Sequence, residues 1–64
     1  MSRGAARYLV TATLLRATMP LTLEEIVLAA GPSRPAVLNA LWDLVGEGMV
    51  VEERLSVAEV VYRA

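Results

Sequence analysis

The sequence predicts a small α+β protein in which three helices are followed by a two-stranded β-sheet. Apolar residues recur at helical spacing through most of the chain. Helix start and stop signals divide that region at 22–25 and at 31–35. β-Branched residues gather near the end of the chain, at 50–51 and 60–61. The 64 residues suit one domain, 1–64, with a single hydrophobic core.

The first helix is expected at about 5–17. Its apolar positions have the spacing of one helical face, and Arg7 and Arg16 are left for solvent. The residues of that face are Leu9, Val10, Thr13, Leu14 and Ala17. Threonines weaken the intrinsic helix propensity of this segment, so packing must stabilise it.

The second helix is expected at about 23–30. Thr22 and Glu25 have the spacing of a capping box, in which each side chain binds the backbone N–H of the other residue. Gly31 is suited to the left-handed conformation that ends a helix.

The third helix is expected at about 34–47. Ser33 is a good N-cap residue, Pro35 is tolerated in a first turn, and Gly48 ends the helix. The short turn between the second and third helices is typical of a helix-turn-helix unit.

The two strands are expected at about 49–55 and 58–63. The connection around Ser56 and Val57 lacks the residues that adopt positive φ in two-residue hairpins. We therefore expect either a longer turn, or a short irregular or helical piece at 56–59.

The run LTLEEIVLAAGPSRPAVLNAL, 21–41, resembles the middle of ArsR-like and MarR-like winged-helix regulators, and GEGMVVEER with VVYRA resembles their wing. The resemblance extends from about Arg7 to the last residue. It implies a winged helix-turn-helix fold, with the third helix in the DNA major groove. The thiolate and imidazole ligands of the metal sensors, and the C-terminal dimer helix of the ArsR-like proteins, have no counterpart in this sequence.

The resemblance also implies which residues contact DNA. In the third helix the positions concerned are Ser33, Arg34, Ala36, Leu38 and Asn39, and Arg54 is the corresponding residue of the wing. Arg34 can bind a guanine edge or a phosphate, and Asn39 can pair with adenine. Leu38 and Ala40 offer at most contact with a thymine methyl group. An alternative is that Arg34 and Arg54 are ordinary solvated charges.

A second apolar stripe lies beside the core stripe of the third helix. It consists of Leu38, Trp42 and Val45, and Leu28 is a further apolar residue at a position that is usually polar in the resembled proteins. Either the first helix or the last strand covers this stripe, or it is a surface for a protein partner, with Trp42 as the anchor.

Composition narrows the classes of function. The chain has no Cys and no His, which excludes disulfides and thiolate or imidazole metal sites, and it has no phosphate-binding glycine loop. We therefore expect no enzyme, no cofactor and no metal. The net charge is −1, and all six basic residues are arginines, so no net charge attracts nucleic acid. No apolar run is long enough to span a membrane, and we expect a cytoplasmic protein.

Two functions follow. The first is a DNA-binding transcriptional regulator that uses Ser33, Arg34, Asn39 and Arg54 on double-stranded DNA. The alternative is a protein-interaction module that docks or dimerises through Leu28, Leu38, Trp42 and Val45. The sequence favours DNA binding by a narrow margin, because of the resemblance. With 56% hydrophobic residues in so small a chain, we also expect a homodimer or a protein partner. A dimer is expected to form through the first helix, the second stripe or the edge of the last strand.

Overall fold

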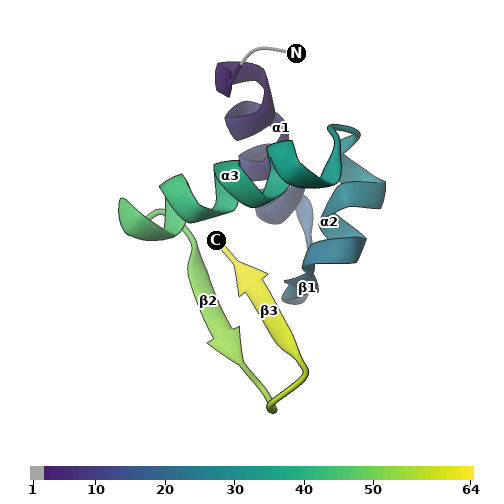
Figure 1. The fold of residues 1–64 in the computed structure, drawn as a ribbon, viewed down its shortest axis with the longest axis vertical. Helices are drawn as coiled ribbons and strands as arrows, with labels where there is room; N and C mark the ends of the chain where they lie inside the picture. Colours follow the sequence, from purple (N-terminus) through teal and green to yellow (C-terminus); the bar gives the residue numbers. More distant parts are fainter. Residues whose placement is uncertain (1–2) are drawn as a thin grey trace.

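The computed structural model describes residues 3–64, apart from the side chain of Arg3. Three helices are followed by a small antiparallel sheet, which is the predicted α+β fold class and the winged-helix arrangement (Figure 1). The elements in chain order are α1 (Arg3–Arg16), β1 (Leu21–Thr22), α2 (Leu23–Ala30), α3 (Arg34–Gly46), β2 (Val51–Arg54) and β3 (Val60–Arg63).

The predicted capping box starts α2. The Thr22 hydroxyl accepts a hydrogen bond from the Glu25 amide at 3.2 Å, and the Glu25 carboxylate accepts one from the Thr22 amide at 2.8 Å. At the other end Gly31 adopts a φ of 101°, and its N–H donates to the Val27 carbonyl. Glycine adopts this φ without strain, which allows the chain to turn sharply toward α3.

The caps of α3 place it directly after that turn. Ser33 is extended, and its hydroxyl accepts a hydrogen bond from the Ala36 amide at 3.4 Å. Glu47 caps the other end, and Gly48, with a φ of 78°, reverses the chain into the hairpin. The positions of α2 and α3 therefore follow from capping residues that are visible in the sequence.

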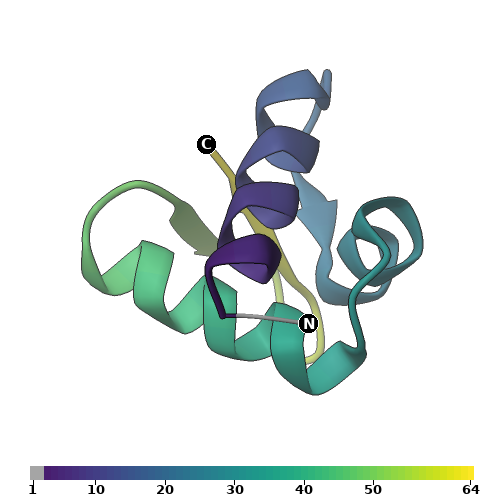
Figure 2. The same ribbon diagram turned by 90° about the horizontal axis from the view of Figure 1, so that it is seen from above.

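The core lies where the three helices meet the sheet. Figure 1 shows α3 crossing in front of α1, and Figure 2, seen from above, shows α1 passing over α3 with α2 on one side of the pair. The largest fully buried side chains are Ile26, Leu41, Leu44, Val10 and Val37, which come from all three helices. Tyr62 of β3 closes the core from the sheet. This packing leaves one long side of α3 in solvent.

The sheet has three strands in the order β1-β3-β2, which corrects the expectation of two strands. Leu21 pairs with Tyr62, and Thr22 pairs with Val61. Since β3 has a neighbour on each side, its edge is not exposed and cannot form a dimer interface. The free edge beyond β3 belongs to β2.

The hairpin between β2 and β3 closes with a longer turn, as one of the two alternatives predicted. The Leu55 amide donates to the Glu59 carbonyl at 2.8 Å, and the Glu59 amide donates to the Ser56 carbonyl at 3.4 Å. No residue other than glycine has a positive φ in the part of the chain described, so this turn needs no glycine. Both strands are shorter than predicted, because 49–50 and 55–59 lie outside them.

Candidate functional site on helix α3

The solvent side of α3 is a continuous helical face. Pro35, Asn39, Trp42 and Gly46 are all exposed, and their spacing of four, three and four residues follows one side of a helix. We call these four residues the outer face of α3. None of them is charged. Figure 1 shows that α3 leads directly into the hairpin of β2 and β3.

Ala40 does not belong to this face. We expected of it at most a contact with a thymine methyl group, but its exposed fraction is 3% and it packs in the core. The reason is helical geometry: Ala40 lies three residues after Val37 and four before Leu44, on the buried side of α3. The expectation that Ala40 is available for DNA contact was wrong.

The second apolar stripe divides into covered and uncovered residues. Trp42 is 60% exposed, whereas Val45 is half-buried and packs against the core, and Leu38 is half-buried. Leu28, on α2, is 86% exposed. Val45 therefore belongs to an enlarged core, whereas Trp42 and Leu28 belong to the open surface.

Arg34 lies in the first turn of α3 and is already engaged. Its Nη2 is 3.0 Å from Oε1 of Glu24, in the first turn of α2, and its Nε donates to the same carboxylate. The hydrogen bond and the charge of Glu24 raise the pKa of Arg34. Both side chains are more than half exposed, so the pair is accessible but carries no net charge.

The other residues predicted to contact DNA are separated. Ser33 uses its hydroxyl as the cap of α3, and Asn39 is exposed on the outer face. Arg54 is exposed on the wing, where its Nη1 donates to the Val57 carbonyl at 3.4 Å.

A pocket of about 370 Å³ lies between the start of α3 and the wing. Its lining includes Arg34 and two glutamates, Glu24 and Glu59, in addition to Tyr62 and Val60 of β3. One positive and two negative side chains make an unfavourable surface for phosphate. The pocket is therefore net acidic.

Two further ion pairs reduce the basic surface. Arg7 of α1 forms two hydrogen bonds of 2.8 Å with Glu47 at the end of α3, and Arg63 of β3 donates to Glu53 of β2 at 2.7 Å. Sequence reasoning missed all three pairs between arginine and glutamate, since their partners are ten or more residues apart. Within 4–64, the arginines outside these three pairs are Arg16 and Arg54.

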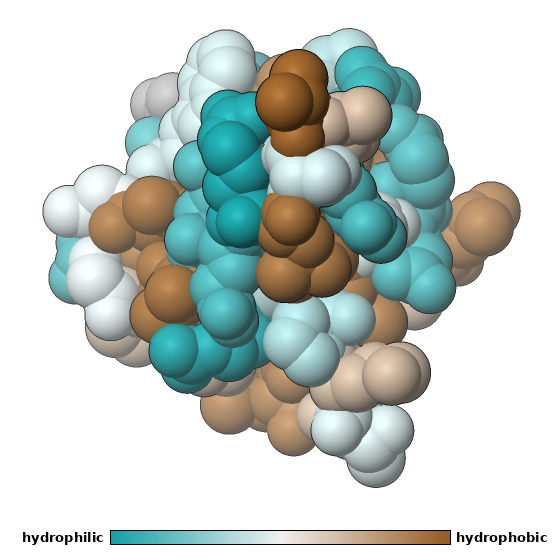
Figure 3. Space-filling view, turned by 90° about the horizontal axis from the view of Figure 1, so that it is seen from below, coloured by the Kyte–Doolittle hydropathy of each residue, from teal (hydrophilic) through white to brown (hydrophobic). Residues whose placement is uncertain are grey.

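Exposed hydrophobic side chains extend beyond α3. Tyr8 and Leu15 are about 70% exposed on the side of α1 that faces away from the core. Their spacing of seven residues places both on one side of the helix, and this signal is visible in the sequence. Figure 3, which looks at the molecule from the side of the hairpin, shows the hydrophobic residues as several separate patches among polar ones.

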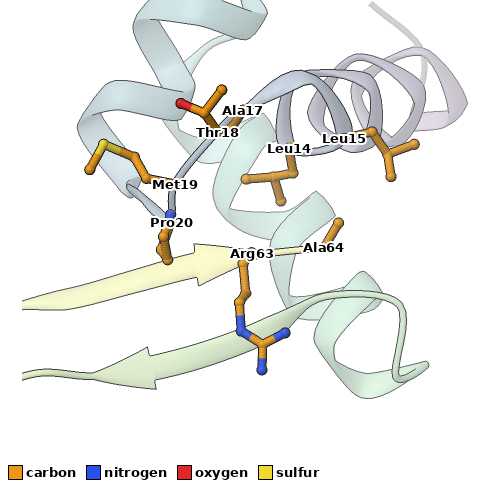
Figure 4. Close-up of a pocket in the computed structure, with 8 residues that line it drawn as sticks. All are labelled: Leu14, Leu15, Ala17, Thr18, Met19, Pro20, Arg63 and Ala64. Atoms are coloured by element: carbon orange, nitrogen blue, oxygen red, sulfur yellow. The ribbon is translucent and has the colours of Figure 1, made fainter.

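Another hollow, of about 300 Å³, lies between the end of α1 and the end of β3 (Figure 4). Leu14, Leu15, Met19 and Pro20 supply much of its wall, and Arg63 is the charged residue that lines it. Because Arg63 is bound to Glu53, its guanidinium is not free for a ligand in this hollow. We assign it no function.

Comparison of the chain with protein-family models, with curated proteins and with solved structures found no match. Over the described residues, no helix is long and apolar enough to cross a membrane. In the same residues no group of three or more acidic side chains is placed to hold a metal ion.

Proposed function

We propose that this domain is a protein-interaction module that docks through the outer face of α3, with Trp42 as its anchor. The observation behind this proposal is the 60% exposure of Trp42 on a helical face without charge. Exposed tryptophan is a favoured anchor of protein interfaces, because burying its large ring releases much water from apolar surface. The partner would offer an apolar pocket for the ring and an acceptor for the indole N–H.

The charges support a protein partner over nucleic acid. A reading helix normally presents cationic and polar side chains to the groove. Here the outer face has only Asn39 with suitable chemistry, and the nearest arginine on α3, Arg34, is paired with Glu24. The net charge of −1 adds no general attraction to phosphate.

Double-stranded DNA remains the second candidate. The observation in its favour is that Arg34, Asn39 and Arg54 are all exposed, on the helix and the wing that such proteins use. DNA binding would require Arg34 to exchange Glu24 for a phosphate or a base. This function would make the protein a transcriptional regulator.

Co-purification from cells that make this protein tests the first function. Trp42→Ala is expected to remain folded and to lose a partner that the unaltered chain retains, because it removes the anchor. Leu15→Ala is the matched control, since Leu15 is an equally exposed apolar residue on a different helix. Equal retention by the two variants would contradict the proposal.

Fluorescence separates the two candidates, because Trp42 is the only tryptophan. A pool of random duplex DNA is titrated into the protein at low salt. DNA docked on α3 would cover the exposed indole and change its emission, with an affinity that falls steeply as salt is added. We expect the emission of Trp42 to stay unchanged as duplex DNA is added.

A further inference from the structure

Strand β2 has a free edge. It is the last strand in the order β1-β3-β2, and three of the four residues of its sequence, VEER, are charged. A free edge is a template for antiparallel pairing, and the charges on this one restrict pairing to a strand whose charges match. This edge is separate from the outer face of α3.

The hydrogen bonds of the hairpin show which residues face that edge. The Leu55 amide points inward, because it donates to Glu59 across the hairpin. Backbone groups alternate along a strand, so those of Glu53 and Val51 also point toward β3. The N–H and C=O groups of Glu52 and Arg54 therefore point outward, toward the open edge.

The sequence around this edge is symmetric about Glu53. On either side of it, Glu52 and Arg54 have opposite charges, and the next positions outward, Val51 and Leu55, are both apolar. Val51 is 38% exposed and Leu55 is 60% exposed. Met49 and Val57, two residues further out on each side, are also apolar and exposed.

We propose that two copies of this chain pair antiparallel through the free edge of β2, on a twofold axis at Glu53. In this register Glu52 of one copy lies opposite Arg54 of the other, and the two residues exchange both backbone hydrogen bonds. The symmetry repeats the pair, which gives two ion pairs and four backbone bonds. Val51 of each copy lies opposite Leu55 of its partner on the other face of the sheet.

The neighbouring registers are disfavoured. A twofold axis at Glu52 places that carboxylate against its own copy, and it also needs the Val50 amide, which donates to Leu44. An axis at Arg54 places two arginines face to face. An axis between two residues would set outward-facing backbone groups against inward-facing ones. Only the axis at Glu53 combines paired charges with available backbone groups.

Glu53, the residue on the twofold axis, does not prevent this pairing. Two Glu53 carboxylates would face each other, but each is hydrogen-bonded to Arg63 of its own chain at 2.7 Å. The sheet would then have six strands, with the helices of both copies on the same side. Because the edge is only four residues long, we expect a weak, concentration-dependent dimer.

Charge reversal tests the register. Glu52→Arg alone and Arg54→Glu alone each turn both ion pairs into like-charge pairs, which should weaken self-association roughly tenfold or more. A mixture of the two single variants should form a heterodimer, because each chain then meets its opposite charge. Glu59→Arg and Arg16→Glu are the charge-matched controls, and we expect them to dimerise as the unaltered chain does.

Sedimentation over a wide concentration range supplies the readout, and circular dichroism confirms that every variant is folded. A chain that is monomeric throughout would overturn the proposal. A dimer that is indifferent to both reversals, or a mixture that does not recover association, would overturn it as well. A dimer that fails either of these charge tests would use another surface, such as the Tyr8 and Leu15 side of α1.

A single cysteine tests the axis directly, because the chain has none of its own. Cα atoms of directly opposed residues in a non-hydrogen-bonded antiparallel pair lie about 4.5 Å apart, within the range of a disulfide. Glu53→Cys should therefore cross-link rapidly on mild oxidation. Val57→Cys, which is 95% exposed, should cross-link more slowly, although random collision favours it. The reverse order would exclude the proposed axis.

Discussion

At the scale of single residues, Tyr62 is the side chain whose chemistry depends most on the fold. It is 6% exposed in the core, and burial, followed by the hydrogen bond with Glu52, raises the pKa of its hydroxyl. The neutral form is therefore favoured in the folded chain. In the unfolded chain the hydroxyl loses its proton first.

This shift predicts a loss of stability in alkaline solution. The contribution of Tyr62 is fully present below the unfolded pKa of about 10, and it disappears as pH rises through the folded pKa. Tyr62→Phe should reduce that alkaline decline, although it also removes the hydroxyl contact. Denaturant midpoints over an alkaline pH series measure the effect. Tyr8→Phe, at an exposed tyrosine, should leave the decline as it is.

The ion pair between Arg7 and Glu47 predicts that the stability of the fold decreases in acid solution. Hydrogen bonding to Arg7 lowers the pKa of Glu47 below its ordinary value. The stabilisation is present above the unfolded pKa and is lost as pH falls through the folded pKa. The effect should be small and sensitive to salt, because both side chains are partly exposed. Unfolding midpoints of Glu47→Gln should show a flatter acid limb, and an unchanged limb would contradict this account.

Residue environments were only partly predictable from the sequence. Helical spacing was sufficient to place Val37, Leu41 and Leu44 in the core, and it would have placed Ala40 there too. The error at Ala40 came from transferring contact positions from a resembled family. The pairing of Arg34 with Glu24 could not be predicted from spacing, because it depends on how two helices meet.

At the scale of elements, the capping box of α2 is a local device with a measurable contribution. Thr22→Ala removes the oxygen that accepts from the Glu25 amide, and should lower the free energy of unfolding by about 1 kcal/mol. Glu25→Gln retains the reciprocal contact and should have a smaller effect. Chemical denaturation of both variants tests this. No loss at Thr22→Ala, with a clear loss at Glu25→Gln, would show that charge at the helix start, rather than the cap, is what stabilises α2.

Elements that depend on local signals were predicted well, and elements that depend on distant pairing were not. The N-caps at Thr22 and Ser33, and the glycine at 48, set the ends of α2 and α3 within a residue or two. Strand β1 has only two residues and exists because Leu21 pairs with Tyr62, far along the chain. No local pattern distinguishes such a strand from a loop.

At the scale of the whole molecule, the stability of the fold depends on one small hydrophobic core. A domain of 64 residues has a total stability of about 3 to 10 kcal/mol. Ile26 is fully buried, and Ile26→Ala should lower stability by about 2 to 5 kcal/mol. That loss is large enough to leave a substantial part of the population unfolded. Thermal unfolding followed by circular dichroism measures it.

Leu28 is the matched control on the same helix. It is 86% exposed, and Leu28→Ala should leave the midpoint of unfolding nearly unchanged. A large loss at Leu28 would mean that this side of α2 is covered in solution, by another copy or by a partner. Comparison of Ile26→Ala with Leu28→Ala thus distinguishes the buried side of α2 from its exposed side.

The arrangement of the whole chain was predictable as three helices and a hairpin, but its function was not. The sequence favoured DNA binding because it resembles winged-helix regulators. Within 4–64, three of the five arginines are paired with glutamates, while Trp42 stands uncovered. Charge pairing and exposure are properties of the assembled surface, so neither could be read from the order of residues.

Photo-cross-linking at position 42 tests the central claim most directly. A photoreactive phenylalanine analogue replaces Trp42 in cells that make this protein, and the same analogue at Leu15 is the control. We predict one discrete polypeptide adduct at position 42 that is absent at position 15 and is lost when Leu38→Asp is added. Adducts that nuclease removes, or no adduct specific to position 42, would contradict docking of a protein on the outer face of α3.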